Sequence, residues 1–142
     1  MHFVSPKRNS KEDGLLLNLA MPHGCSVWPA WWTVGPNWPN GGEIDIVENV
    51  HEATHNQYTL HTSSGCTLNR SPQTNLAQPF TSSIVGTVCA SSNGDNDGCA
   101  FVDDNANSYG HGFNDVAGGV YTMLWNDEGI SICLFRNVER VC

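Results

Sequence analysis

Basic residues and long apolar runs are both scarce in this sequence, and each scarcity excludes a class of partner. Only six Lys and Arg residues stand against 14 Asp and Glu, which gives a formal net charge of −8 over 142 residues. Nucleic acids and anionic surfaces attract basic patches, so we expect no nucleic-acid partner. No apolar run approaches the roughly 20 residues of a transmembrane helix, so we expect no membrane partner either.

Residues 1–10 also lack the apolar core of a signal peptide. Two other features nevertheless favour a secreted protein. Six cysteines in an acidic chain indicate an oxidising compartment, and Asn69-Arg70-Ser71 is a glycosylation sequon. Sequence alone does not fix the disulfide pairing, but Cys89 and Cys99 bracket a loop of Gly, Asn and Asp and are expected to pair. The remaining cysteines are Cys25, Cys66, Cys133 and Cys142.

Helical periodicity, internal repeats and linkers are missing as well, which leaves strands and turns. Short apolar or alternating stretches are separated by clusters rich in Gly, Asn and Ser, a pattern typical of an all-β sandwich. The expected strands are residues 15–20, 27–34, 43–48, 57–62, 84–89, 100–102, 120–125 and 130–135. The last two should form a hairpin, and the length allows a single domain.

The most informative stretch is residues 41–48, which read GGEIDIVE. Its apolar β-branched residues suit a strand, and its two glycines suit an entry turn. In a regular strand, Glu43 and Asp45 would share one face while Glu48 would point into the core. A buried, unpaired carboxylate there would be costly. We therefore predict a β-bulge at residues 46–47, because one extra residue returns Glu48 to the face of the other two carboxylates.

Three carboxylates on one strand face suggest acid–base chemistry. With the bulge, the two glutamates behave as residues four steps apart, about 13 Å between backbones at roughly 3.3 Å per step. Side chains that lean toward each other approach the roughly 5–5.5 Å carboxyl separation of a retaining glycosidase. Repulsion from the central Asp45 should raise the pKa of its neighbours and help keep one glutamate protonated. The alternative interpretation is a solvated acidic edge strand, and spacing alone does not separate the two.

The residues around this strand favour the first interpretation. Residues 28–48 read WPAWWTVGPNWPNGGEIDIVE and closely resemble the signature region of glycoside hydrolase family sixteen. They look most like the fungal endo-1,3(4)-β-glucanases, or laminarinases, with a bulged E-x-D-x-x-E motif. The resemblance continues through residues 59–66 and 118–125, and it covers most of residues 14–136, weakly between 67 and 107.

The resemblance implies a fold and a domain organisation. The fold would be a concanavalin-like jelly roll, an all-β sandwich with a concave cleft. Family domains run to roughly twice this length, in the range of other one-domain β-sandwiches. We therefore expect residues 1–142 to be a single partial catalytic domain that lacks some edge strands.

The resemblance also implies a role for each carboxylate. Glu43 would be the nucleophile, Glu48 the general acid/base, and Asp45 the carboxylate that orients and tunes the pair. The reaction would be double displacement on β-1,3-glucan or mixed β-1,3-1,4-glucan, with retention of the β configuration. A neutral polysaccharide suits the acidic chain. We expect a secreted monomer that needs no cofactor and no metal.

Four further residues are expected to bind glucosyl units: Trp31, Trp38, His61 and Trp125. Tryptophan suits this role because its ring face covers a sugar face while its N–H finds a partner. Neighbouring Trp31 and Trp32 must point to opposite faces of their strand, and parity favours Trp31 for the cleft. His61 as an ordinary sheet histidine and Trp125 as a core residue remain alternative interpretations.

Two other interpretations of the whole chain stay open. A carbohydrate-binding protein on the same sandwich would use the tryptophans but would not need paired glutamates, so Glu43 and Glu48 count against it. An inactive fragment of such a domain would keep every motif. Cys133, where the family usually has a tryptophan, favours an atypical or inactive product.

A second motif indicates a different chemistry. The string His51-Glu52-Ala53-Thr54-His55 matches the H-E-x-x-H pattern of zinc metallopeptidases, and His61 falls where an extended form places its third ligand. The pattern requires both of its histidines on one helical face, with the glutamate as base. This segment is poor in helix formers, and Tyr58 occupies the glycine position of the extended form. We therefore predict a loop between two strands, with a zinc peptidase as the alternative.

Overall fold

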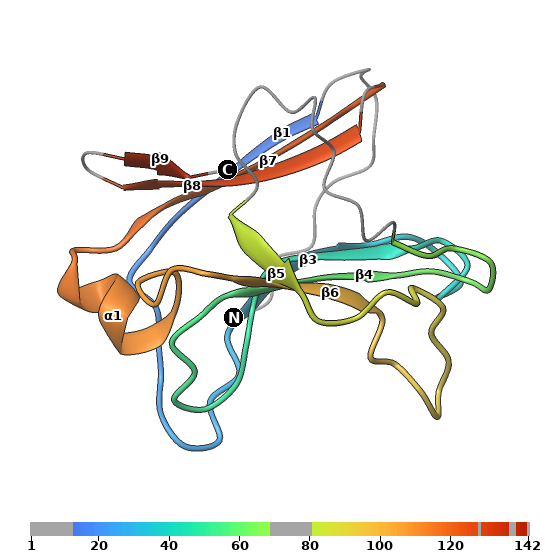
Figure 1. Cartoon of the computed structure of the whole chain (residues 1–142), viewed down its shortest axis with the longest axis horizontal. Coiled ribbons are helices and arrows are strands. Elements are labelled where there is room, and N and C mark those ends of the chain that lie inside the picture. The colour runs from blue at the N-terminus through green and yellow to red at the C-terminus, as the bar shows by residue number, and fades with distance from the viewer. Residues whose placement is uncertain (1–12, 69–80, 128, 137–138, 142) are drawn as a thin grey trace.

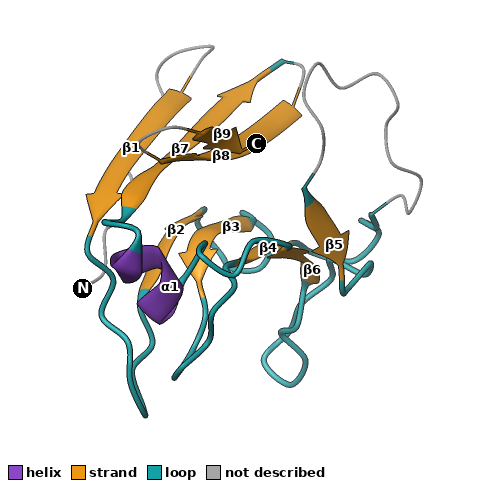
Figure 2. Cartoon of the chain, turned by 60° about the vertical axis from the view of Figure 1, so that its left-hand side comes forward, coloured by secondary structure: helices purple, strands orange, loops and turns teal. Residues whose placement is uncertain are grey.

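The computed structural model describes residues 13–68, 81–127, 129–136 and 139–141 (Figure 1). Within these residues the chain forms two antiparallel β-sheets that lie face to face, with a short helix at one end (Figure 2). This arrangement confirms the predicted all-β sandwich. The sequon at residues 69–71 and Cys142 lie outside the described residues.

Strand order is simple within each sheet. The four-stranded sheet contains, in spatial order, β1 (Asp13–Leu19), β7 (Gly119–Asn126), β8 (Gly129–Arg136) and β9 (Glu139–Val141). The five-stranded sheet contains β2 (Ala30–Val34), β3 (Glu43–Glu48), β4 (Gln57–His61), β6 (Cys99–Asp103) and β5 (Ser82–Ile84). The predicted hairpin is β7–β8. The predicted strand 84–89 is replaced by the earlier and shorter β5.

The core lies between the two sheets because apolar side chains of both point inward. It contains Met21, Trp31, Ile44, Ile46, Val47, Tyr109, Phe113, Tyr121, Met123 and Leu134. Side chains alternate along a strand, so the other face of the five-stranded sheet carries the opposite set of residues. That outer face carries the carboxylates.

Helix α1 (Gly110–Asp115) was not predicted, since six residues are too few to show a helical period. Its Phe113 is fully buried and stacks on Tyr121 at a ring-centroid distance of 6.0 Å. Gly110 has a φ of +61°, and a Cβ there would lie 2.3 Å from the carbonyl oxygen of Ala53. The helix therefore begins at a position that only glycine fits. In the described part of the chain, no helix is long and apolar enough to cross a membrane.

The predicted disulfide between Cys89 and Cys99 is present. It joins the start of β6 to the segment that follows β5, so it closes the loop of residues 90–98 beside the five-stranded sheet. Cys25 and Cys66 are exposed free thiols.

Candidate active site

Strand β3 carries the predicted bulge. Asp45 pairs with Thr59 of β4 and Glu48 pairs with Gln57, so three steps along β3 match two steps along β4. The extra residue turns Glu48 to the face that carries Glu43 and Asp45, and all three side chains line the same cleft. The predicted geometry of the carboxylates is therefore confirmed.

The cleft is open and lies on the outer face of the five-stranded sheet, with a volume of about 1020 Å³. Its wall combines carboxylates, indole rings and uncharged polar groups. Besides the three carboxylates, its lining includes Trp28, Trp32, Trp38, Gln57, Thr59 and His61, and the loop residues Asp95, Asn96 and Asp97. Flat rings beside hydrogen-bonding groups are what a sugar chain needs for binding.

Each glutamate receives one indole N–H. Trp28 Nε1 donates to Glu48 Oε1 at 2.7 Å, and Trp38 Nε1 donates to Glu43 Oε2 at 2.5 Å. Both bonds favour the ionised glutamate, because an N–H donates a stronger hydrogen bond to a negatively charged carboxylate than to a neutral carboxyl group. The sequence did not assign Trp28 to the site, because residues 27–34 were expected to form one strand; β2 begins only at Ala30, and Trp28 reaches Glu48 from the segment before it.

The pKa values of the two glutamates reflect burial and repulsion. Burial, and after it the charge of Asp45, raises the pKa of Glu48 to about 7, although the Trp28 hydrogen bond acts in the opposite direction. The same two causes raise the pKa of Glu43, against the lowering effect of the Trp38 hydrogen bond. A carboxyl group with a pKa near 7 holds a proton at neutral pH about half of the time, as a general acid must.

Asp45 and His61 form a buried pair between the glutamates. Asp45 is 2% exposed, and its Oδ2 lies 3.1 Å from His61 Nε2. The other ring nitrogen of His61 lies 2.9 Å from Ser91 Oγ. The hydrogen bond to Asp45 raises the pKa of His61, although burial lowers it. His61 therefore lines the cleft as predicted, and both of its ring nitrogens form hydrogen bonds with neighbouring side chains.

The loop before β3 places Trp38 over the cleft. Gly35 N–H donates to the Gly42 carbonyl at 2.8 Å, which closes the base of the loop. A Cβ on Gly35 would lie 2.1 Å from the carbonyl oxygen of Gly41, so the two chain segments meet with no room for a side chain. This close approach is why the turn needs glycine, and it carries Trp38 back to Glu43.

The prediction that Trp31 lines the cleft is wrong. Trp31 is 4% exposed and belongs to the core, while Trp32 lines the cleft. The register between β2 and β3 explains the exchange. Trp32 pairs with Asp45 in the regular part of the ladder and therefore shares the face of the carboxylates. Trp31 lies opposite Val47 at the bulge, and its side chain points to the core face.

A correction also applies to Trp125. It lies on β7, in the sheet opposite the carboxylates, and it shares strand parity with the buried Tyr121 and Met123. Trp125 is not among the described residues that line the cleft. Trp125 is 37% exposed and does not belong to the core of the described residues, so the alternative interpretation as a core residue is not supported either.

The segment with the H-E-x-x-H pattern is a loop between β3 and β4, as predicted. His51 has a φ of +59°, and its Nδ1 accepts a hydrogen bond from the Ser26 N–H at 3.0 Å. His55 Nδ1 lies 2.8 Å from Thr54 Oγ1. The two histidines do not share a helical face, so the geometry of a zinc peptidase is not formed.

Comparisons with known proteins agree with this geometry. The family model of the XgeA-like catalytic domain of glycoside hydrolase family 16 matches residues 11–140. A probable glycosidase of Schizosaccharomyces pombe is 42% identical over 132 residues, which are 90% of this chain and 30% of that protein. An endo-1,3(4)-β-glucanase of Arthroderma benhamiae is 41% identical over 121 residues, 81% of this chain and 25% of that protein. This chain therefore spans less than a third of the length of these curated relatives.

A solved structure supports the assignment of the fold. Laminarinase 16A of Phanerochaete chrysosporium, with 6-O-glucosyl-laminaritriose in its donor and acceptor sites, superposes with a TM-score of 0.78 at 33% identity. The match covers 92% of this chain and 42% of that chain. The fold is accordingly the jelly-roll form of the β-sandwich.

Proposed function

The chain belongs to glycoside hydrolase family 16, and on that premise we propose that it hydrolyses β-1,3-glucan or mixed β-1,3-1,4-glucan with retention of configuration. We further propose that residues 1–142 form one part of a longer catalytic domain, secreted as a monomer. The observation that carries the proposal is the bulged β3, which presents Glu43, Asp45 and Glu48 to one cleft. Relatives named as glucanases support the class of substrate.

In the first step of the proposed mechanism, a Glu43 oxygen attacks the anomeric carbon of the glucan. The glycosidic bond breaks as Glu48 gives its proton to the departing oxygen, and a covalent glycosyl-enzyme remains. Burial supports this role because it raises the pKa of Glu48 to about 7. The Trp38 N–H fixes one Glu43 oxygen and so orients the nucleophile.

In the second step, Glu48 takes a proton from water and the resulting hydroxide attacks the same carbon. The bond to Glu43 breaks, and the sugar regains the β configuration. Glu48 must be an anion at this stage, and the Trp28 N–H donates to that anion at 2.7 Å. One side chain thus acts as acid and then as base.

Asp45 acts on both glutamates without touching the reacting carbon. Its charge contributes to the raised pKa of Glu43 and of Glu48, and its bond to His61 holds it in place. Trp28, Trp32 and Trp38 present rings to the sugar, so Trp32 takes the place that parity had given to Trp31. The acidic cleft disfavours sulfated glycans and suits a neutral glucan.

Azide rescue of a Glu48→Gln variant tests the proposal, in the catalytic domain of which this chain is a part. The rate of β-1,3-glucan hydrolysis should fall by about 10²–10⁴-fold, which is the usual contribution of a general acid to the rate. An aryl β-glucoside with a good leaving group should still react, because it needs little acid assistance. Azide should accelerate that reaction and yield a β-glycosyl azide. Glu43→Gln, the matched variant, should show no such turnover.

Two results would contradict the proposal. The first is an α-anomer as the first-formed product in NMR of the wild-type reaction, because it requires inversion. The second is azide rescue of the Glu43 variant alone. Tight glucan binding without hydrolysis in the wild-type domain would instead favour the carbohydrate-binding interpretation.

A further inference from the structure

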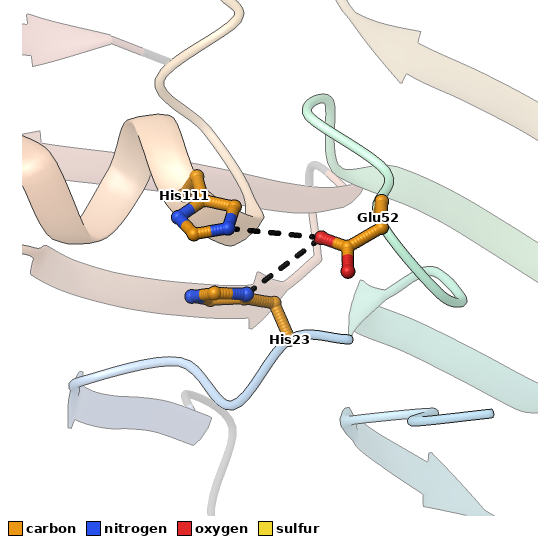
Figure 3. A group of neighbouring side chains, drawn as sticks. All are labelled: His23, Glu52 and His111. Carbon is orange, nitrogen blue, oxygen red and sulfur yellow. Dashed lines mark ion pairs between the residues drawn. The ribbon is translucent and has the colours of Figure 1, made fainter. Parts of the chain in front are cut away.

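Three side chains that do not line the cleft meet elsewhere on the surface: His23, Glu52 and His111 (Figure 3). They come from the β1–β2 connection, the β3–β4 loop and the first turn of α1. Glu52 Oε2 lies 3.7 Å from His23 Nδ1 and 3.8 Å from His111 Nε2. The two imidazole rings are 3.5 Å apart between centroids. The two neighbouring imidazoles thus each direct one ring nitrogen at the same carboxylate oxygen.

We propose that His23, Glu52 and His111 bind a zinc-class ion, with water as the fourth ligand. Two histidines and one glutamate form a ligand set that zinc uses, and imidazole nitrogen disfavours calcium and magnesium. At metal–ligand distances of about 2.0–2.1 Å, neighbouring tetrahedral ligands lie roughly 3.3–3.4 Å apart. The three ligand atoms already lie within 4.8 Å of one another, so short side-chain movements complete the site.

Exposure agrees with an ion that solvent reaches. The side chain of His23 is 25% exposed, that of Glu52 60% and that of His111 65%. A metal bound between them keeps an open side for a water ligand. The open side also allows the ion to exchange with solution, so the site can be emptied by a chelator.

Backbone hydrogen bonds already hold the two loops and the start of α1 together around the cluster. The Gly24 N–H donates to the His51 carbonyl at 3.2 Å, and the His51 N–H donates to the Val27 carbonyl at 2.8 Å. The Tyr109 N–H donates to the Thr54 carbonyl at 3.2 Å, which joins the start of α1 to the same loop. A site whose backbone is fixed in advance loses little conformational entropy when it binds.

The proposed site reuses the glutamate of the H-E-x-x-H string with different histidines. His55 of the string bonds to Thr54 and is not part of the cluster, whereas His23 and His111 are remote from the string in sequence. Two substitutions therefore distinguish the two possible zinc sites. If the cluster of His23, Glu52 and His111 binds zinc, His111→Gln should lose the metal and His55→Gln should keep it. If the H-E-x-x-H string binds zinc, the reverse should hold.

Zinc binding to the 142-residue chain tests the proposal, by calorimetric titration with Zn²⁺ and by metal analysis after gel filtration. We expect one zinc per chain. His23→Gln and His111→Gln should each weaken binding by more than about tenfold, because loss even of an outer-sphere partner costs about 10–100-fold. His55→Gln is the matched control and should bind as the wild type does. Cobalt substitution should give the visible absorption of a tetrahedral site, which His111→Gln abolishes.

A thermal readout separates loss of the site from loss of the fold. Without metal, His111→Gln and the wild type should unfold at the same midpoint, since this side chain is mostly exposed. With zinc, the midpoint should rise for the wild type and for His55→Gln but not for His111→Gln. The proposal is overturned if the wild type binds no zinc, if both cluster variants keep it, or if His55→Gln loses it. Glucan hydrolysis is a separate readout, because the cluster lies outside the cleft.

Discussion

Glu48→Gln should stabilise the folded chain above pH 7, although it removes the proposed acid/base. The folded-state pKa of Glu48 is about 7, against 4.5 for an unperturbed glutamate, so ionisation favours the unfolded state. The sign follows from linkage. Below pH 4.5 both states are protonated and Glu48 costs nothing, whereas the cost grows as the pH rises and is complete above pH 7. The full difference corresponds to about 3 kcal/mol at about 1.4 kcal/mol per pKa unit.

Solvent screening reduces this value because water reaches part of the Glu48 side chain, so we expect a gain of about 1–2 kcal/mol at pH 8. Urea unfolding of the wild type and the variant at pH 4 and pH 8 measures it. The variant should match the wild type at pH 4 and exceed it at pH 8. Asp127→Asn, which removes an exposed carboxylate from the β7–β8 turn, should show no such pH-dependent gain. A Glu48 variant that is less stable than the wild type at pH 8 would refute the reasoning.

Two further predictions concern the indole rings. Trp28→Phe should raise the pKa of Glu48 in a carbon-13 NMR titration, because water replaces only part of the lost donor at a residue that is 66% exposed. An unchanged or lowered pKa would contradict the assigned bond. Trp31→Ala should destabilise the fold by about 3–5 kcal/mol in urea unfolding. Trp32→Ala should instead weaken β-1,3-glucan binding by about 1 kcal/mol in calorimetry. If Trp31→Ala weakened glucan binding and Trp32→Ala destabilised the fold, the placement of Trp32 in the cleft would be wrong.

The features that the sequence predicted correctly all depend on residues that are close together in the chain. A regular strand would have buried Glu48 without a partner, and the cost of that burial predicted the bulge that the structure contains. The Cys89–Cys99 pair and the β7–β8 hairpin are also local, since each closes a short loop. Short-range patterns of this kind depend on few neighbours, so they survive into the fold.

The features that sequence missed depend on pairing between segments. The bulge in β3 was predicted, but the register of β2 against β3 was not, and this register pairs Trp32 with Asp45 and leaves Trp31 opposite Val47 in the core. The Trp28 bond to Glu48 joins positions 20 residues apart, outside any strand rule. His23 and His111 meet at Glu52 only because two loops and the start of α1 lie side by side in the fold. No periodicity in the sequence marks such a meeting.

The placement of Glu43, Asp45 and Glu48 on one continuous strand has a consequence for mechanical tolerance. Their mutual spacing is set by five peptide bonds and by the ladders that β3 forms with β2 and β4. A change in the distance or the alignment of the two sheets therefore moves all three carboxylates together, as one rigid unit. The interlayer packing can therefore fluctuate, or drift during evolution, without changing the separation of the two glutamates.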